Sequence, residues 1–188
     1  QDNLDLSLPV SGSSINFFIA GKFGSPSTAD KDAVIEVIDP SSGSVLSTTP
    51  LMVRIRKNAN NLTNAERNRF ISAMATLNDR GMGKFSDFRN IHTNAGSPEA
   101  HFDAGFLPWH RAFLLDLERE LQVIDPSIAL PYWRFDQPAP NLFARDFIGV
   151  ANSTGTLEFS ASNPLQFWVT DMSPGIVRPP QFNTMTGF

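Results

Sequence analysis

The sequence predicts a mainly α-helical fold that follows a small β-sheet and ends in a loop-rich tail. Apolar residues alternate in short runs before position 57, which is typical of strands. From Thr63 to about Val123 they repeat at helical spacing instead. After Trp133, six prolines interrupt a stretch with little periodicity. We therefore divide the chain into a strand-rich segment, 1–57, and a helical part with its tail, 58–188.

Three short runs in the first part are predicted to form a small sheet. Ile15–Ala20 is apolar and rich in β-branched and aromatic residues, while Ala33–Ile38 and Leu51–Ile55 alternate. Turn-forming residues at 24–26 and 39–43 lie in the segments between these runs.

The first predicted helix begins after Thr63, because Thr63 and Glu66 have the spacing of a capping box. Phe70, Ile71, Met74 and Leu77 follow at helical spacing, and glycines at 81 and 83 are expected to end the helix.

Two further helices are predicted on either side of a loop at 94–105. One runs from about Lys84 to Thr93, and the other from near Pro108 to about Val123. The second of these carries an apolar stripe of Phe113, Leu114, Leu117 and Leu121. In the tail, only a short helix at 141–148 is expected.

Composition excludes several classes of protein and of site. The net charge of −4 gives no reason to expect a nucleic-acid partner, and no apolar run approaches the roughly 20 residues that span a membrane. There are no cysteines, so a metal site here has to use His, Asp or Glu. The chain starts at Gln1 without a visible signal peptide, which fits a processed, secreted product or a trimmed chain.

The three histidines of the chain all lie between positions 92 and 110. His92 and His110 are predicted on the inward faces of successive helices, and His101 on the loop between them. Imidazole binds copper and zinc well, and a helix–loop–helix can bring three rings to one point. Taken singly, each helical histidine reads as a hydrogen-bonded core residue and His101 as a solvated one. Their clustering favours a metal site.

The segment from His101 to Trp133 carries a longer motif. It reads HFDAGFLPWHRAFLLDLERELQVIDPSIALPYW. It resembles the first copper-binding segment of tyrosinases, catechol oxidases and related hemocyanin domains, in which two histidines nine positions apart precede a helix with a Glu and then Leu-Pro-Tyr-Trp. Residues 53–70 are similar to the first helix of bacterial-type members. The resemblance covers roughly 50–188, most specifically 88–136.

This resemblance implies a type-3 copper four-helix-bundle core, of which the chain would supply the first half. His92, His101 and His110 would hold the first of two copper ions. The residues expected around these ligands are Phe106, Trp109, Arg111 and Glu118. Arg111 is expected to pair with an acidic neighbour, and Glu118 to anchor either a ligand imidazole or Arg111.

The implied activity is copper-dependent oxidation of phenols by dioxygen, from o-diphenol to o-quinone, with hydroxylation of monophenols as an extension. The family uses a second set of three histidines, and this chain has none after His110. We therefore expect a second chain that carries the second copper site, with the alternative that this sequence is a fragment of a longer protein. Two departures from the family pattern are that Arg134-Phe135-Asp136 follows Leu-Pro-Tyr-Trp and that no cysteine is present to tether His101.

Three alternatives remain open from the sequence. A hemocyanin-like oxygen carrier would use the same ligands but cap the coppers against phenols. A three-histidine zinc hydrolase or lyase would work with one metal and no second chain. A degenerate structural domain would have lost its copper. Formation of o-quinone from catechol separates the first of these from the oxidase.

Overall fold

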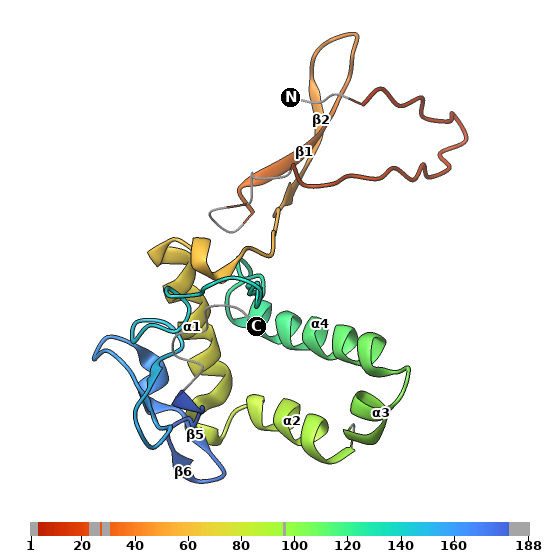
Figure 1. Cartoon of the computed structure of the whole chain (residues 1–188). Helices are drawn as coiled ribbons and strands as arrows, with labels where there is room; N and C mark the ends of the chain where they lie inside the picture. The colour runs from red at the N-terminus through yellow and green to blue at the C-terminus, as the bar shows by residue number, and fades with distance from the viewer. Residues whose placement is uncertain (1–3, 23–26, 28–30, 96, 181–188) are drawn as a thin grey trace.

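The computed structural model describes residues 4–22, 27, 31–95 and 97–180, and it confirms a mainly α-helical class with small sheets. A β-hairpin projects from the helical part, as Figure 1 shows. The helices are α1 (Asn64–Asn78), α2 (Phe85–Asn90), α3 (Ser97–Phe102) and α4 (Phe106–Ile124), with single turns η1 (Ala59–Asn61), η2 (Asp79–Gly81), η3 (Ile91–Ala95) and η4 (Pro164–Phe167). The strands are β1 (Ala33–Ile38), β2 (Val45–Leu51), β3 (Val150–Ala151), β4 (Leu157–Glu158), β5 (Val169–Thr170) and β6 (Ser173–Pro174), paired antiparallel as three two-stranded sheets.

The projecting hairpin confirms the strand predicted at 33–38. Ala33 pairs with Leu51, and the register shifts at a bulge near the end of β1. The predicted turn at 39–43 is built on Asp39, whose carboxylate accepts hydrogen bonds from the hydroxyls of Ser41 and Ser42 at 2.7 Å each. These bonds lower the pKa of Asp39 to about 2.

Two other strand predictions were wrong. The second strand of the hairpin is Val45–Leu51, not Leu51–Ile55. The segment 51–55 is extended but outside the sheet: Val53 and Ile55 are half-buried, Arg54 is exposed, and the Arg54 Nε donates to the Pro126 carbonyl after α4. Residues 15–20 form no strand and pair with none among the described residues. Their β-branched and aromatic residues favour a strand only where a neighbouring strand is available to pack against. The turn expected at 24–26 lies outside the described residues.

Helix α1 begins as predicted and ends three residues before Gly81. Thr63 accepts from the Glu66 N–H at 3.2 Å, and the Glu66 carboxylate accepts from the Thr63 N–H at 2.9 Å. Beyond the helix, Gly83 lies so close to the end of α1 that a Cβ there would sit 2.2 Å from the Leu77 carbonyl oxygen. Only glycine therefore allows α2 to start this near to α1.

The tail forms turns rather than the predicted helix at 141–148, and it supplies much of the core. The buried amide of Asn163 donates to the carbonyls of Arg145 and Phe147 at 3.1 and 2.6 Å. The backbone bonds here are those of successive turns, from the Phe147 N–H to the Ala144 carbonyl and from the Ile148 N–H to the Leu142 carbonyl, and not the regular i to i−4 bonds of an α-helix. The main hydrophobic cluster joins Ala59 and Ile71 to tail residues Ala139, Leu142, Phe143, Phe147, Leu165 and Trp168.

A second hydrophobic cluster joins α1 to the C-terminal half of α4. Leu117 and Leu121 are buried there, whereas Leu114 of the predicted stripe is 43% exposed. The N-terminal half of α4 thus leaves apolar surface uncovered. In the part of the chain that the structure describes, no helix combines the length and apolarity of a membrane span.

Candidate metal centre

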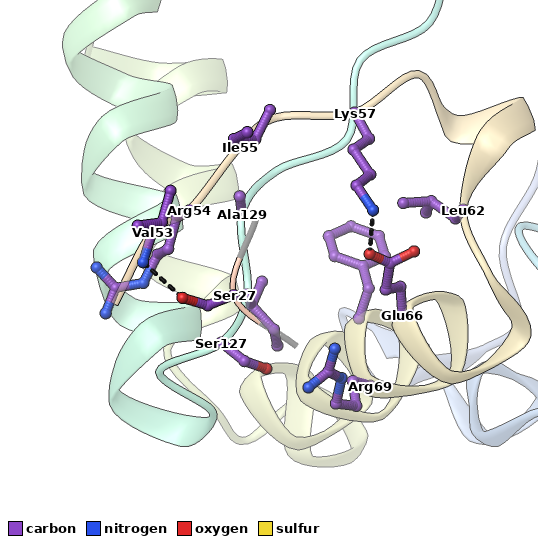
Figure 2. A pocket seen from close by; sticks show the side chains of 12 residues that line it. Ser27, Val53, Arg54, Ile55, Lys57, Leu62, Glu66, Arg69, Ser127 and Ala129 are labelled. Carbon is purple, nitrogen blue, oxygen red and sulfur yellow. Dashed lines mark hydrogen bonds and ion pairs between the residues drawn. The ribbon is translucent and has the colours of Figure 1, made fainter. Parts of the chain in front are cut away.

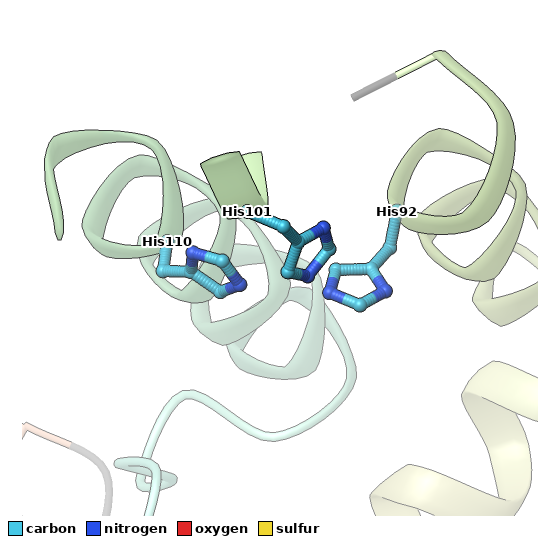
Figure 3. A group of neighbouring side chains, drawn as sticks. All are labelled: His92, His101 and His110. Atoms are coloured by element: carbon cyan, nitrogen blue, oxygen red, sulfur yellow. The ribbon is translucent and has the colours of Figure 1, made fainter. Parts of the chain in front are cut away.

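The three histidine rings converge on one point between α2, α3 and α4 (Figure 3). Ring centroids are 4.9 Å apart for His92 and His101, 5.4 Å for His101 and His110, and 5.6 Å for His92 and His110. One nitrogen from each ring lies within 4.8 Å of the other two. An ion bound about 2.0 Å from each would space them roughly 3.3 Å apart, so modest ring rotations complete the site. Among the described residues, no other group of three His, Asp or Glu side chains converges this way.

Each ligand stands on a different element of the chain. His92 lies in η3, a π-helical turn that follows α2 and widens the last helical turn. His101 lies in the last turn of α3, where the sequence predicted a loop. That prediction was wrong because Pro98 stands in the first turn of this short helix, a position that tolerates proline, rather than breaking it. His110 lies in the second turn of α4.

The backbone fixes which nitrogen of His110 is free. His110 Nδ1 lies 2.8 Å from the carbonyl oxygen of Phe106, one turn earlier in α4. A carbonyl oxygen only accepts, so Nδ1 carries the proton and donates it. The lone pair of Nε2 therefore points away from the helix and is free for a metal ion.

Aromatic rings cover the inner side of the cluster. Trp109 stacks on Phe113 with centroids 5.0 Å apart, and the His92 ring lies 5.7 Å from Trp109 and 5.6 Å from Phe113. Phe106 lies 4.4 Å from His110 and is 46% exposed. Both Phe106 and Trp109 thus contact ligand rings, while His101 remains exposed on the open side.

Glu118 and Arg111 lie elsewhere than the sequence suggested. The buried carboxylate of Glu118 accepts from Arg56 Nε and Nη2 at 3.0 and 2.8 Å and from the Leu130 N–H at 2.8 Å. It meets neither a ligand imidazole nor Arg111, because eight residues along α4 correspond to about 12 Å. Arg111 is exposed and forms none of the ion pairs found among the described residues.

Two pairs of supporting residues escaped the sequence argument. Arg56 clamps the chain before α1 onto α4, and a buried Glu that needs a cationic partner was the available signal. Arg89 of α2 pairs with Asp171 of the tail, and nothing in the sequence connects those two positions.

A pocket seen in Figure 2 is separate from the histidines. It lies between the 53–57 segment, α1 and the 127–129 turn, and its lining includes the ion pair of Lys57 with Glu66. Burial would raise the pKa of Glu66, but hydrogen bonds from Lys57 and Thr63 outweigh it and lower that pKa. The residues that line this pocket hold the N-terminal end of α1 against the 53–57 segment.

The comparison with known proteins decides the family. Residues 82–186, which include all three histidines, match the common central domain of tyrosinase. The chain belongs to the tyrosinase family. Over 105 residues it is 41% identical to a tyrosinase of Streptomyces glaucescens, a match that covers 50% of this chain and 38% of that relative.

Other similar proteins extend the same picture. A grixazone synthase of Streptomyces griseus is 37% identical over 92 residues, 44% of this chain and 29% of the relative. A putative tyrosinase-like protein, tyr-3, of Caenorhabditis elegans is 32% identical over 143 residues, 71% of this chain and 20% of the relative. This tyrosinase-family chain therefore spans well under half the length of the relatives that it matches.

The donor set suits copper, the metal that the tyrosinase family implies. Three neutral imidazoles bind copper well, and no carboxylate joins them in the group. His110 presents Nε2 with its proton held on the far nitrogen. The residues present therefore fit the ion.

Proposed function

We propose that this chain supplies one copper site of an enzyme that oxidises phenols with dioxygen, with His92, His101 and His110 as the ligands. The observation that supports this most directly is the convergence of three imidazole nitrogens to within 4.8 Å in a chain of the tyrosinase family. Copper bound there would supply one-electron redox chemistry and an open coordination position.

The residues around the ligands have distinct parts in this proposal. The Phe106 carbonyl keeps the His110 proton on Nδ1, which orients the ring. Trp109 and Phe113 exclude water from the inner side of the cluster. A phenol then approaches from the side where His101 is exposed.

A second polypeptide segment is part of the proposal. Reduction of dioxygen to peroxide takes two electrons. One copper ion supplies one electron, so a second ion is required. Next to the histidines, Phe102 is 84% and Leu107 75% exposed, and Leu114 and Leu115 of α4 are 43% and 39% exposed. Apolar surface gathered in this way marks an interaction site. We propose that a segment with the second histidine set packs on it, from a second chain or from a longer form of this one.

The reaction proposed is oxidation of o-diphenols to o-quinones, and hydroxylation of monophenols if the completed site admits them.

The first test is a Cu²⁺ titration of the 188-residue chain. We expect about one ion per chain, with affinity reduced in His92→Ala, His101→Ala and His110→Ala by more than the roughly 10–100-fold that loss of a ligand's supporting partner costs. Arg111→Ala, which changes an exposed neighbour of a ligand, is the control and should bind like the unaltered chain. Equal affinity in all variants would refute the site.

The second test is catalytic and uses the chain together with its completing segment. Catechol is added to the copper-loaded assembly, and o-quinone is followed by its absorbance. Full loading without product would favour an oxygen carrier. Zinc has no redox chemistry and cannot yield o-quinone, so hydrolytic turnover by the zinc-loaded chain alone is the result that would favour the hydrolase alternative, although no carboxylate lies in the described histidine group to act as its base.

A further inference from the structure

Helix α2, which positions His92, has little support of its own. It has six residues, none of them buried, and no side-chain cap at its start. Phe85 packs on Trp168 of the tail at 4.7 Å, and Phe88 packs on Phe113 of α4 at 5.7 Å. Helices this short are unstable in isolation, so what lies against α2 decides where His92 points.

An ion pair of α2 lies two residues before the π-helical turn. Arg89 Nη1 forms an ion pair with Asp171 Oδ2 of the tail, and the Arg89 side chain is 28% exposed. The Arg89 carbonyl accepts a hydrogen bond from the Thr93 hydroxyl at 2.9 Å. Arg89 is therefore bonded through its side chain to the tail and through its carbonyl to Thr93, the residue that follows His92.

On the other side of this pair, the tail presents Asp171 from a strained turn. Asp171 and Met172 connect β5 to β6 with φ values of 49° and 64°; Asp is common at the first position of such a turn, whereas the second position usually holds Gly and here holds Met172. Met172 is 94% exposed, so core packing does not explain the strain. The turn places a carboxylate where Arg89 meets it.

The hairpin itself is fixed to α1. The buried side chain of Asn78 donates from Nδ2 to the Val169 carbonyl at 3.0 Å and accepts from the Val169 N–H at 3.2 Å, as a neighbouring strand would. A continuous series of contacts thus runs from α1 through β5 and Asp171 to Arg89.

We infer that Asp171 is a positioning residue for His92 that acts through Arg89, so that the tail hairpin sets the geometry of the metal site. This inference rests on the proposed function for its consequence, but the contact itself is independent of the metal. Without Asp171, α2 loses its ion pair to the tail and depends on the packing of Phe85 and Phe88, so His92 has more orientations to lose when it binds an ion.

Asp171→Asn tests the inference, because asparagine tolerates the same backbone conformation but carries no charge. We expect the full chain with this change to bind Cu²⁺ roughly fivefold more weakly, the low end of energetic coupling between sites. In the metal-free protein, amide hydrogen exchange at residues 89–93 should become faster. Arg89→Gln should behave in the same way, and Asp171→Glu should recover part of the affinity. Met172→Gly, which relaxes the turn and keeps the ion pair, should bind like the unaltered chain.

A merely structural contact would lower the melting temperature and leave Cu²⁺ affinity unchanged well below it, and that result would overturn the inference. Unaltered hydrogen exchange at 89–93 in both Asp171→Asn and Arg89→Gln would overturn it as well. If the unaltered chain bound no copper, the proposed function would fail, while hydrogen exchange would still decide whether Asp171 orders the His92 segment.

Discussion

At the scale of single residues, polar side chains take the place of backbone partners where regular structure ends. Asn78 pairs with the backbone of Val169, and Asn163 binds the carbonyls of Arg145 and Phe147. The Phe106 carbonyl does the reverse and receives the proton of a side chain, that of His110. Buried polar groups without such partners would cost about 1–3 kcal/mol each.

The protonation of His110 can be checked without any mutation. We expect the neutral ring to be the Nδ1-protonated tautomer, because Phe106 accepts that proton. Nitrogen-15 chemical shifts of the metal-free chain above pH 8 distinguish the two tautomers directly. A dominant Nε2-protonated form would contradict the hydrogen bond and the orientation argued for the ligand.

The clamp between Glu118 and Arg56 predicts a dependence of stability on pH. Partial burial would raise the pKa of Glu118, but Arg56 and the Leu130 N–H outweigh it, so the folded-state pKa lies below the usual 4.5. The unfolded chain then takes up its proton first as the pH falls. The stabilisation is complete above about pH 4.5 and is lost as the pH drops through the folded-state value.

Glu118→Gln should remove this effect and destabilise the chain at pH 7 by about 1–2 kcal/mol. Melting temperatures measured between pH 7 and pH 3.5 should fall less steeply for the variant than for the unaltered chain. Glu158→Gln, at an ion pair exposed on the surface, is the control and should cost less than about 0.5 kcal/mol at pH 7. Parallel curves for Glu118→Gln and the unaltered chain would contradict the clamp.

At the scale of elements, α1 is defined by its own sequence and the smaller elements by their neighbours. Removing the cap with Thr63→Ala should cost about 1 kcal/mol, because the Glu66 N–H loses its acceptor. Thr76→Ala is the matched control on the same helix, since Thr76 is exposed and alanine is the better helix former. Urea unfolding should therefore separate the two variants by more than 1 kcal/mol, and equal stabilities would contradict the capping role.

The same contrast explains which elements the sequence could predict. The capping box and the spacing of Ile71 and Leu77 are local signals, and they located α1 correctly. The tail hairpin is bonded to the distant Asn78, and the segment before the π-helical turn is paired with the distant Asp171. No local sequence pattern predicted either element. In the site, residue types and spacing sufficed to select the three histidines that the structure brings together. The partner of Glu118 could not be predicted, because Arg56 lies 62 positions away in the chain.

At the scale of the whole molecule, the helical part and the hairpin are unequal in their packing. The main core is formed by α1 with the tail, while Val34, Ile38 and Leu46 of the hairpin are 55%, 47% and 66% exposed. Figure 1 shows β1 and β2 standing away from all four helices. We therefore expect the helical part to fold without the residues before about position 50, none of which belongs to either described core cluster.

Deleting residues 1–50 tests this division. Arg56 and its bond to Glu118 remain in the shortened chain, so we expect Cu²⁺ affinity within about twofold of the full chain, which is close to the error of an additive change at a distant site. The melting transition should stay cooperative. A tenfold loss of affinity, or loss of cooperative melting, would show that hairpin and helices fold as one unit.

The ion pair of Arg89 and Asp171 also has a consequence for biosynthesis. The histidines precede Asp171 by some 60–80 residues, which at about 5–20 residues per second is a delay of several seconds on the ribosome. During that interval the nascent chain carries all three histidines, but it lacks the Asp171 contact that we infer to position His92. Ions captured then would be held about fivefold more weakly, so the site would reach its full affinity only once translation has delivered the tail.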